Sequence, residues 1–242
     1  SLELVQGLEL AEKDFEAVSD GQRQRVLLAR AICQEPEVIV LDEPTSFLDI
    51  RHKLELLSIL KEMVRKQHVA VLMSLHELDL AQKVSDLVIC VHGDRIERCG
   101  VPEEIFTDEY IRQLYGVTAG SYNASFGCLE MGAPEGKPEV FVIGGNGSGI
   151  PTYRRLQRAG IPFAAGVLHE NDVDYQVAKD LAAEVIVEQP FEEISEEAYQ
   201  KAYASMKKCR EVICCMDAFG TFNKKNQLLR EEAGRMKKLK IN

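Results

Sequence analysis

The chain has 242 residues, which at roughly 100 to 200 residues per domain suits one large domain or two small ones. Hydrophobic residues make up 45% and charged residues 28%, a composition that excludes disordered, collagen-like and membrane-spanning classes. Lys and Arg number 29 against 39 Asp and Glu, and the formal net charge of -10 disfavours binding to nucleic acid. The longest apolar runs, such as Val69–Leu75, are shorter than the roughly 20 residues that a bilayer crossing needs, so we expect no direct membrane insertion.

The seven cysteines form no C-x-x-C pair and lie mostly in apolar stretches, which is typical of buried thiols in a reducing cytoplasm. The first residues are Ser1 and Leu2 where a natural start has Met. We therefore expect the chain to be a piece of something longer.

The first part of the chain alternates short apolar runs with helical patterns. Continuous apolar runs are typical of parallel strands buried on both faces, and they predict strands at Val38–Leu41, Ala70–Met73 and Leu87–Val91. Leucines at helical spacing predict an amphipathic crossover helix over Arg51–Lys66.

Residues 122–138 are rich in Gly and Pro and lack apolar periodicity, which predicts a linker. The alternation resumes after it, with strands expected at Val140–Ile143, Phe163–Leu168, Val185–Val187 and Val212–Cys215. The sequence thus predicts an α/β fold with domains at 1–121 and 139–242, the second a smaller Rossmann-like α/β unit.

Two adjacent carboxylates, Asp42 and Glu43, follow the apolar run Val38–Leu41. At the carboxyl end of a buried parallel strand they would face a ligand crevice, where one can hold Mg²⁺ and the other can orient an attacking water. An isolated Asp-Glu pair is more often two solvated loop acids. Here, however, polar clusters at Ser19–Arg25 and Ser74–His76 also fall at the ends of predicted elements, which favours a site.

These clusters belong to four ordered motifs: Ser19–Gln22, Leu41–Asp49, His76–Asp79 and Gly93–Ile96. In this order and spacing they resemble the second half of an ATP-binding cassette (ABC) transporter ATPase, most similar to subunits that energise import of metal chelates such as iron siderophores and cobalamin. The resemblance implies a partial P-loop NTPase sheet in residues 1–121, with ATP and Mg²⁺ as cofactors.

Carried over residue by residue, the resemblance implies that Asp42 assists Mg²⁺, Glu43 is the catalytic carboxylate and His76 contacts the γ-phosphate. Asp49 would act across a dimer of cassettes. For His76 alone, a satisfied histidine at a strand end would be the more common explanation.

The resemblance also implies that Ser19, Gly21 and Gln22 form a signature loop that cradles the phosphate held by the opposite subunit. Asp20 departs from the family pattern, which usually has glycine, and its carboxylate must point away from a phosphate. The implied partners are a second copy of the cassette and membrane permease subunits, with the chain peripheral on the cytoplasmic face of the cell membrane.

A cassette also needs the loop G-x-x-x-x-G-K-[ST], whose lysine reaches the β- and γ-phosphates. The nearest match, Gly144–Gly149, continues with Ile150 and Pro151 and lies downstream of the signature-like residues. We therefore expect this chain alone to be inactive as an ATPase. Its first sheet would need a cover: a second copy, the second domain, or partial disorder.

In the second domain, the glycine-rich segment Gly144–Gly149 lies between a predicted strand and a predicted helix. Gly145, Gly147 and Gly149 would allow a phosphate to approach the backbone at the start of that helix. Glu170 or Asp172 would then accept from ribose hydroxyls. The spacing G-x-G-x-G suits a bound nucleotide and an empty tight turn equally well. Two functions stay open: a transport ATPase subunit with an appended domain, or a nucleotide- or cofactor-binding regulatory module whose cassette remnant serves assembly.

Overall fold

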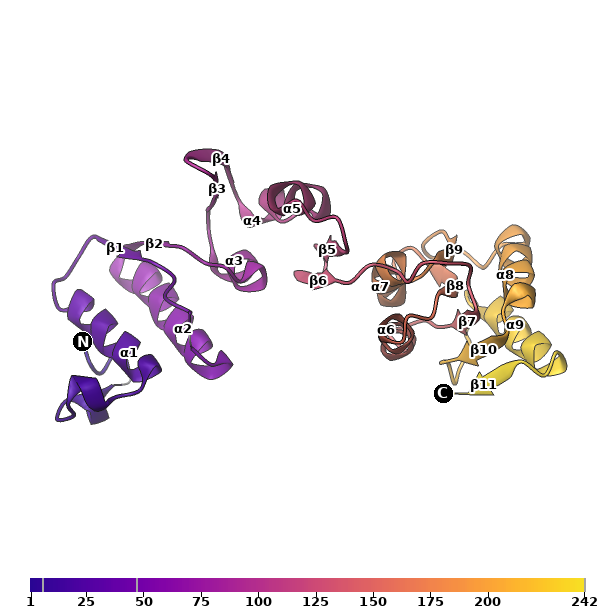
Figure 1. Cartoon of the computed structure of the whole chain (residues 1–242), viewed down its shortest axis with the longest axis horizontal. Coiled ribbons are helices and arrows are strands. Elements are labelled where there is room, and N and C mark those ends of the chain that lie inside the picture. Colours follow the sequence, from indigo (N-terminus) through magenta and orange to yellow (C-terminus); the bar gives the residue numbers. More distant parts are fainter. Residues whose placement is uncertain (6, 47, 242) are drawn as a thin grey trace. The chain divides into compact units, whose positions relative to one another are not determined.

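The computed structural model describes residues 1–5, 7–46 and 48–241. The chain divides into two compact units, Ser1–Ile105 and Phe106–Asn242, each of which combines helices with parallel strands (Figure 1). The predicted α/β class is confirmed. No helix among the described residues is long and apolar enough to cross a bilayer.

The first unit is built around a pair of parallel strands, β1 and β2, that pack on two helices. Its elements are the 3-10 helices η1 (Leu8–Leu10) and η2 (Phe15–Ala17), the helices α1 (Asp20–Ile32), α2 (Ile50–Gln67), α3 (Leu78–Val84) and α4 (Pro102–Ile105), and the strands β1 (Val38–Leu41), β2 (Ala70–Met73), β3 (Val88–His92) and β4 (Arg95–Gly100).

The core of the first unit lies between the two helices α1 and α2 and one face of β1 and β2. Ile39 is 3% exposed, whereas its neighbours Val38 and Val40 are 58% and 70% exposed, and Leu72 on β2 is 53% exposed. The prediction that these strands are buried on both faces is therefore wrong in this structure. One face is bare and apolar.

The apolar run predicted as a third parallel strand also behaves differently. β3 pairs antiparallel with β4, not with the β1–β2 pair, and the two strands turn at Gly93. Ile89 and Val91 on β3 stay exposed. The motif Gly93–Ile96 is the turn and start of β4 in this hairpin.

The second unit has a five-stranded parallel sheet in the order β11-β10-β7-β8-β9. Its elements are the helices α5 (Asp108–Tyr115), α6 (Ile150–Arg158), α7 (Val173–Leu181), α8 (Glu196–Lys208) and α9 (Lys224–Arg235), and the strands β5 (Ser121–Asn123), β6 (Cys128–Glu130), β7 (Val140–Ile143), β8 (Phe163–His169), β9 (Glu184–Glu188), β10 (Glu211–Cys214) and β11 (Leu239–Ile241).

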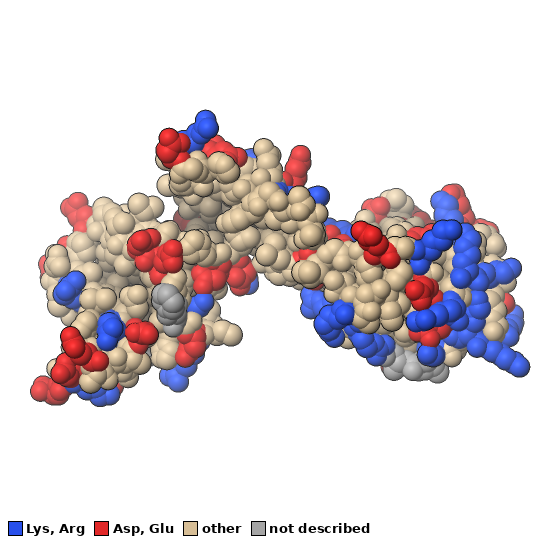
Figure 2. All heavy atoms as spheres, viewed as in Figure 1, with Lys and Arg blue, Asp and Glu red and all other residues tan. Residues whose placement is uncertain are grey.

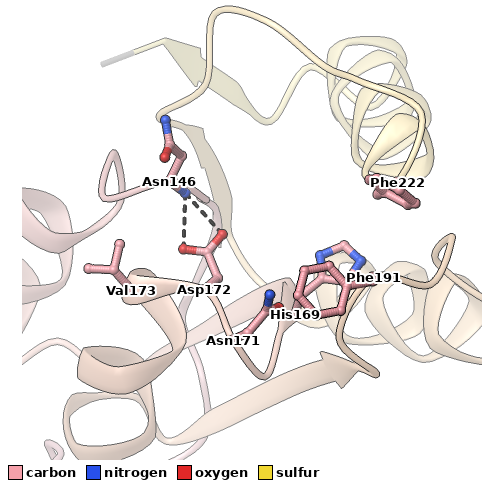
Figure 3. A pocket seen from close by; sticks show the side chains of 7 residues that line it. All are labelled: Asn146, His169, Asn171, Asp172, Val173, Phe191 and Phe222. Atoms are coloured by element: carbon pink, nitrogen blue, oxygen red, sulfur yellow. Dashed lines mark hydrogen bonds between the residues drawn. The ribbon is translucent and has the colours of Figure 1, made fainter. Parts of the chain in front are cut away.

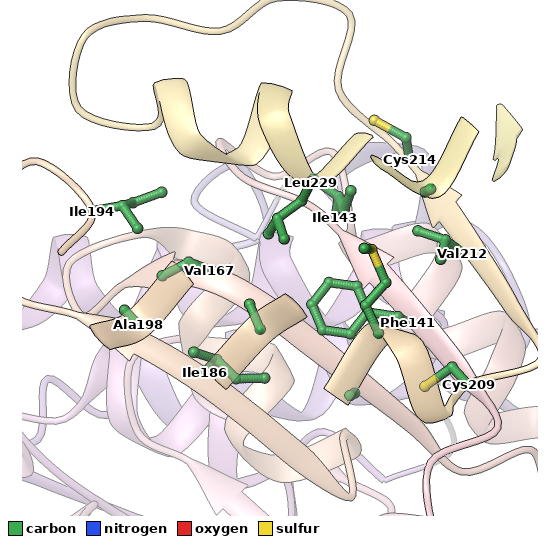
Figure 4. Packing of buried hydrophobic residues seen from close by; sticks show 14 residues of the cluster. Phe141, Ile143, Val167, Ile186, Ile194, Ala198, Cys209, Val212, Cys214 and Leu229 are labelled. Carbon is green, nitrogen blue, oxygen red and sulfur yellow. The ribbon is translucent and has the colours of Figure 1, made fainter. Parts of the chain in front are cut away.

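Helices cover both faces of this sheet. One buried cluster joins Phe141 and Val212 to α8 and α9, for example through Leu229 (Figure 4). The other joins the opposite face to α6 and α7 through Tyr153 and Leu181. The strand order reverses between β7 and β10, and in open parallel sheets ligands bind beside such a reversal at the carboxyl ends of the strands.

The segment predicted as a linker, residues 122–138, contains most of a small antiparallel hairpin of β5 and β6. Asn123 is buried and donates to the Gln176 carbonyl at 2.6 Å, and Glu130 pairs with Arg154 at 2.5 Å. These contacts fasten the hairpin to the second unit.

Several charged side chains on the second unit form exposed ion pairs. Figure 2 shows many Lys and Arg side chains on its visible face. On the helices, Lys201 pairs with Glu197 at 2.7 Å and Lys225 pairs with Glu196 at 3.0 Å. Such exposed pairs contribute little to folding.

The buried side chain of Asn226 on α9 holds an irregular part of β8. The register between β8 and β9 shifts between Ala165 and Leu168, which leaves backbone groups of Val167 without a strand partner. Asn226 accepts from the Val167 N–H at 3.0 Å and donates to its carbonyl at 2.9 Å.

Asn226→Ala should lower the free energy of unfolding of the second unit by about 2 kcal/mol or more, because both Val167 groups would lose their buried partner. Urea unfolding followed by circular dichroism measures this. The matched control is the exposed neighbour Gln227→Ala, which should change stability by less than about 0.5 kcal/mol. Equal effects of the two substitutions would contradict the assigned role.

Candidate functional site

The parallel register of β1 and β2 brings two of the predicted polar clusters together. Leu41 lies opposite Met73, so both chains leave the sheet at the same edge. The Ser74 hydroxyl donates to Asp42 Oδ1 at 2.7 Å and accepts from the Glu43 N–H at 2.7 Å. Sequence reasoning assigned no separate role to Ser74, which joins the two acidic residues.

Glu43 and His76 form a direct pair at this edge. His76 Nε2 lies 2.6 Å from Glu43 Oε1, and Ser46 donates to the other carboxylate oxygen at 2.9 Å. The hydrogen bond from His76 lowers the pKa of Glu43, and the same bond raises the pKa of His76. Both side chains are exposed, 47% and 74%, so the pair is open to a ligand and adds little to folding.

A third acidic residue, Glu77, bonds to the turn after β1 and to α2. Thr45 donates to Glu77 at 2.9 Å, and Lys53 on α2 bonds it at 2.5 Å. The bond from Lys53 is the main cause of the lowered pKa of Glu77. This cluster, which sequence reasoning did not identify, fixes the turn after β1 against α2.

The signature-like residues lie at the start of α1. Ser19 caps the helix, because its hydroxyl accepts from the Gln22 N–H at 3.4 Å while the Gln22 side chain accepts from the Ser19 N–H at 3.1 Å. As the acceptor in this cap, the Ser19 hydroxyl keeps its own hydrogen for a further partner. The Asp20 side chain is 75% exposed and lies 3.8 Å from Arg23.

Gly21 and Asp49 place the starts of α1 and α2 beside each other. A Cβ on Gly21 would lie 3.4 Å from the Leu48 side chain and 3.5 Å from His52. Asp49 caps α2 by accepting from the His52 N–H at 2.9 Å, the main cause of its lowered pKa. Phe47, within the same motif, lies outside the described residues.

The described part of the first unit holds no group of three or more metal-ligating side chains. The donors that fit Mg²⁺ are the carboxylates of Asp42 and Glu43, so any further ligands would have to be phosphate oxygens and water, as is usual for this ion.

In the second unit, the glycine loop after β7 has its backbone donors engaged by two carboxylates. Asp172 accepts from the Asn146 N–H at 3.0 and 2.9 Å, one distance to each oxygen. Asp174, fully buried, accepts from the Gly149 N–H at 2.9 Å, and burial raises its pKa. The position that a phosphate would take at the start of α6 therefore holds Asp174.

The predicted glycines lie at positions that other residues would not fit, because of their backbone conformation or their close neighbours. Gly145 and Gly147 have φ values of +154° and +82°, which favour glycine. A Cβ on Gly149 would lie 2.4 Å from Tyr153 and 2.9 Å from Asp174, so only glycine fits there. Glu170 is exposed beyond β8 and bonds through its backbone, and Asp172, the alternative, lies against the loop.

Comparison with known proteins separates the two units. Residues 2–46 match a family model described as ABC transporter, and residues 163–241 match one described as the MJ0874 family. The first unit is similar to ABC transporter ATPases. The resemblance expected from the four motifs is confirmed.

Curated proteins similar to this chain include ATP-binding proteins of transporters. An uncharacterized ABC transporter ATP-binding protein, MJ0873 of Methanocaldococcus jannaschii, is 36% identical over 160 residues, 66% of this chain and 55% of the relative. A cobalamin import ATP-binding protein of Halobacterium salinarum is 32% identical over 190 residues, 76% of this chain and 48% of the relative. The chain thus spans about half the length of these relatives.

Among solved structures, the ABC-like chain is similar to cbiO1 of Clostridium perfringens, described as part of the ABC transporter complex cbiONQ. The TM-score is 0.42 at 28% identity, and the match covers 46% of this chain and 45% of the other.

The Glu43–His76 pair predicts a specific titration. The pKa of His76 should lie above its ordinary value of 6.5 and fall toward it in Glu43→Gln, because the variant loses the charged acceptor. The paired, charged state is complete above the lowered pKa of Glu43 and is lost as pH rises through the raised pKa of His76. NMR of the His76 ring measures this.

The control for this titration is Glu62→Gln, which removes an acid on α2 that pairs with Lys66. The midpoint of His76 should stay at its wild-type value in the control. A midpoint that is the same in Glu43→Gln and in the wild type would show that the two side chains do not pair in solution.

Proposed function

We propose that the first unit supplies part of the ATP-hydrolysing site of an ABC importer. The observation that carries the proposal is the shared edge of β1 and β2, where Asp42, Glu43 and His76 lie together with Ser74 as their link. In this proposal Glu43 orients or deprotonates a water, and His76 donates to a phosphate oxygen.

ATP with Mg²⁺ is the cofactor that this donor set fits. Asp42 would contribute a carboxylate to the ion, which would supply charge neutralisation on the phosphates when bound. Ser19, Gly21 and Gln22 at the start of α1, with Asp49 nearby, would face the nucleotide of a second cassette. The proposed active form is therefore a dimer.

The bare apolar face of β1 and β2 supports the view that the ATP site needs more than these residues. Val40 and Leu72 stay more than half exposed there, a cost that a further sheet segment would remove. The 242 residues contain no glycine loop followed by lysine. We propose that the segment carrying that loop covers this face, and that the first unit alone does not hold ATP productively.

The cargo class is proposed from the relatives. One is named for cobalamin import, and another, of Bacillus subtilis, for iron(3+)-hydroxamate import, at 37% identity over 111 residues. The proposed role is to energise import of a metal chelate through membrane permease subunits, at the cytoplasmic face of the cell membrane.

A regulatory role for the second unit stays a proposal beside the first. The predicted nucleotide there would have to displace Asp172 or Asp174 from the loop to seat a phosphate. The arrangement favours the ATPase role for the first unit and gives no support to a phosphate on the second.

Glu43→Gln should leave MgATP binding intact and slow ATP hydrolysis by about 10² or more in a cassette that joins these residues to a lysine-bearing glycine loop, because the water loses its base. Phosphate release and equilibrium binding measure the two effects. The control Glu62→Gln should hydrolyse ATP at the wild-type rate. Unchanged turnover in Glu43→Gln would make Glu43 a strand-end acid only.

A further inference from the structure

A cavity of about 320 Å³ lies in the second unit beside the glycine loop, and its volume suits a small organic ligand. It opens beyond the carboxyl ends of β7, β8 and β9, on the side of the sheet where ligands of parallel α/β units bind. Figure 3 shows the lining side chains: Asn146, His169, Asn171, Asp172, Val173, Phe191 and Phe222.

Two phenylalanines that line this cavity expose their apolar rings to solvent, which is energetically unfavourable. Phe191 is 75% exposed and Phe222 is 52% exposed. Phe191 also has a φ of +65°, a left-handed conformation that a bulky residue seldom adopts. A strained backbone that presents an apolar ring to solvent is typical of a functional position, here a wall on which a flat ligand can stack.

The polar side chains that line the cavity include one carboxylate, Asp172, and two amides, Asn146 and Asn171. The Asn146 N–H donates to both oxygens of Asp172, and Oδ1 also accepts from the Asp174 N–H at 2.9 Å. Oδ2 therefore keeps a lone pair for a ligand donor. The amide side chains of Asn146 and Asn171 line the same space and can read the edge of a heterocycle.

Phosphate does not fit beside this cavity. The N–H groups of Asn146 and Gly149, which a dinucleotide-binding loop would turn to a phosphate, donate to Asp172 and Asp174. A phosphate would meet two carboxylates at the place where it needs donors. The phosphate of a nucleotide would therefore have to displace Asp172 or Asp174 from the loop, whereas an uncharged ring system would not.

The geometry points to a binding site for a planar heteroaromatic ligand of the nucleoside class, without phosphate. The ring stacks on Phe191 and Phe222, and its N–H or hydroxyl groups donate to Asp172. This inference does not depend on the ATP site proposed for the first unit, because it rests on residues of the second unit alone.

The test is titration of the full chain with adenosine, guanosine, cytidine and uridine, each beside its 5′-monophosphate. At least one nucleoside should bind saturably and shift the amide resonances of Asn171, Phe191 and their neighbours. Its monophosphate should bind at least about tenfold more weakly, because like charges meet at the loop.

Phe191→Ala and Phe222→Ala should each weaken that nucleoside by about tenfold, the loss expected for one stacking contact. The matched control is Phe126→Ala, an exposed phenylalanine of the same unit that does not line the cavity. Binding of none of the four nucleosides, tighter binding of a monophosphate, or equal effects of Phe126→Ala and Phe191→Ala would each overturn the proposal.

Discussion

The parallel pairing of β1 with β2 is the constraint on which the candidate site of the first unit depends. Leu41 opposite Met73 fixes where each chain leaves the sheet, and only in that register does Ser74 reach both Asp42 and the backbone of Glu43. A slip by one residue would turn every side chain of the strand to the other face. The same two strands leave one apolar face exposed to solvent. We therefore expect a further segment to pack on that face.

The two units treat the start of a helix after a loop in opposite ways. At α1 the cap is the neutral hydroxyl of Ser19, which leaves the positive end of the helix free of a buried negative charge. At α6 the loop donor Gly149 is bonded to the buried carboxylate of Asp174. The start of α1 thus keeps a neutral cap, whereas the loop at α6 is occupied by the Asp174 carboxyl group. This difference favours the proposal that phosphate binds to the first unit and not to the second.

Apolar runs in the sequence predicted much of the fold. The runs Val38–Leu41, Ala70–Met73 and Val140–Ile143 are strands with the same bounds in the structure, because four apolar residues between polar turns leave little choice of ends. The run Leu87–Val91 was predicted as a parallel strand, and this pairing was wrong: the strand found there, β3, pairs antiparallel with β4. A short apolar run does not distinguish a buried parallel strand from one strand of a hairpin, and here the turn at Gly93 decided the pairing.

The candidate sites were predictable only in part. Asp42, Glu43 and His76 follow strands that the pattern identified, so their meeting at one edge could be foreseen from topology. Asp174 could not, because its partner Gly149 lies 25 residues away in the sequence and nothing local signals that a carboxylate will enter the loop. The same holds for Phe191, whose backbone conformation, not its residue type, marks it as unusual.

We propose that the β1–β2 edge is one part of an ATP site whose other part carries the lysine loop. This can be tested by ATP turnover after the chain is mixed with a separate polypeptide that carries a glycine loop followed by lysine in an ABC cassette half. We expect no turnover by either polypeptide alone, and turnover by the mixture that disappears with Asp42→Asn in this chain. Turnover by this chain alone, or turnover by the mixture that survives Asp42→Asn, would contradict it.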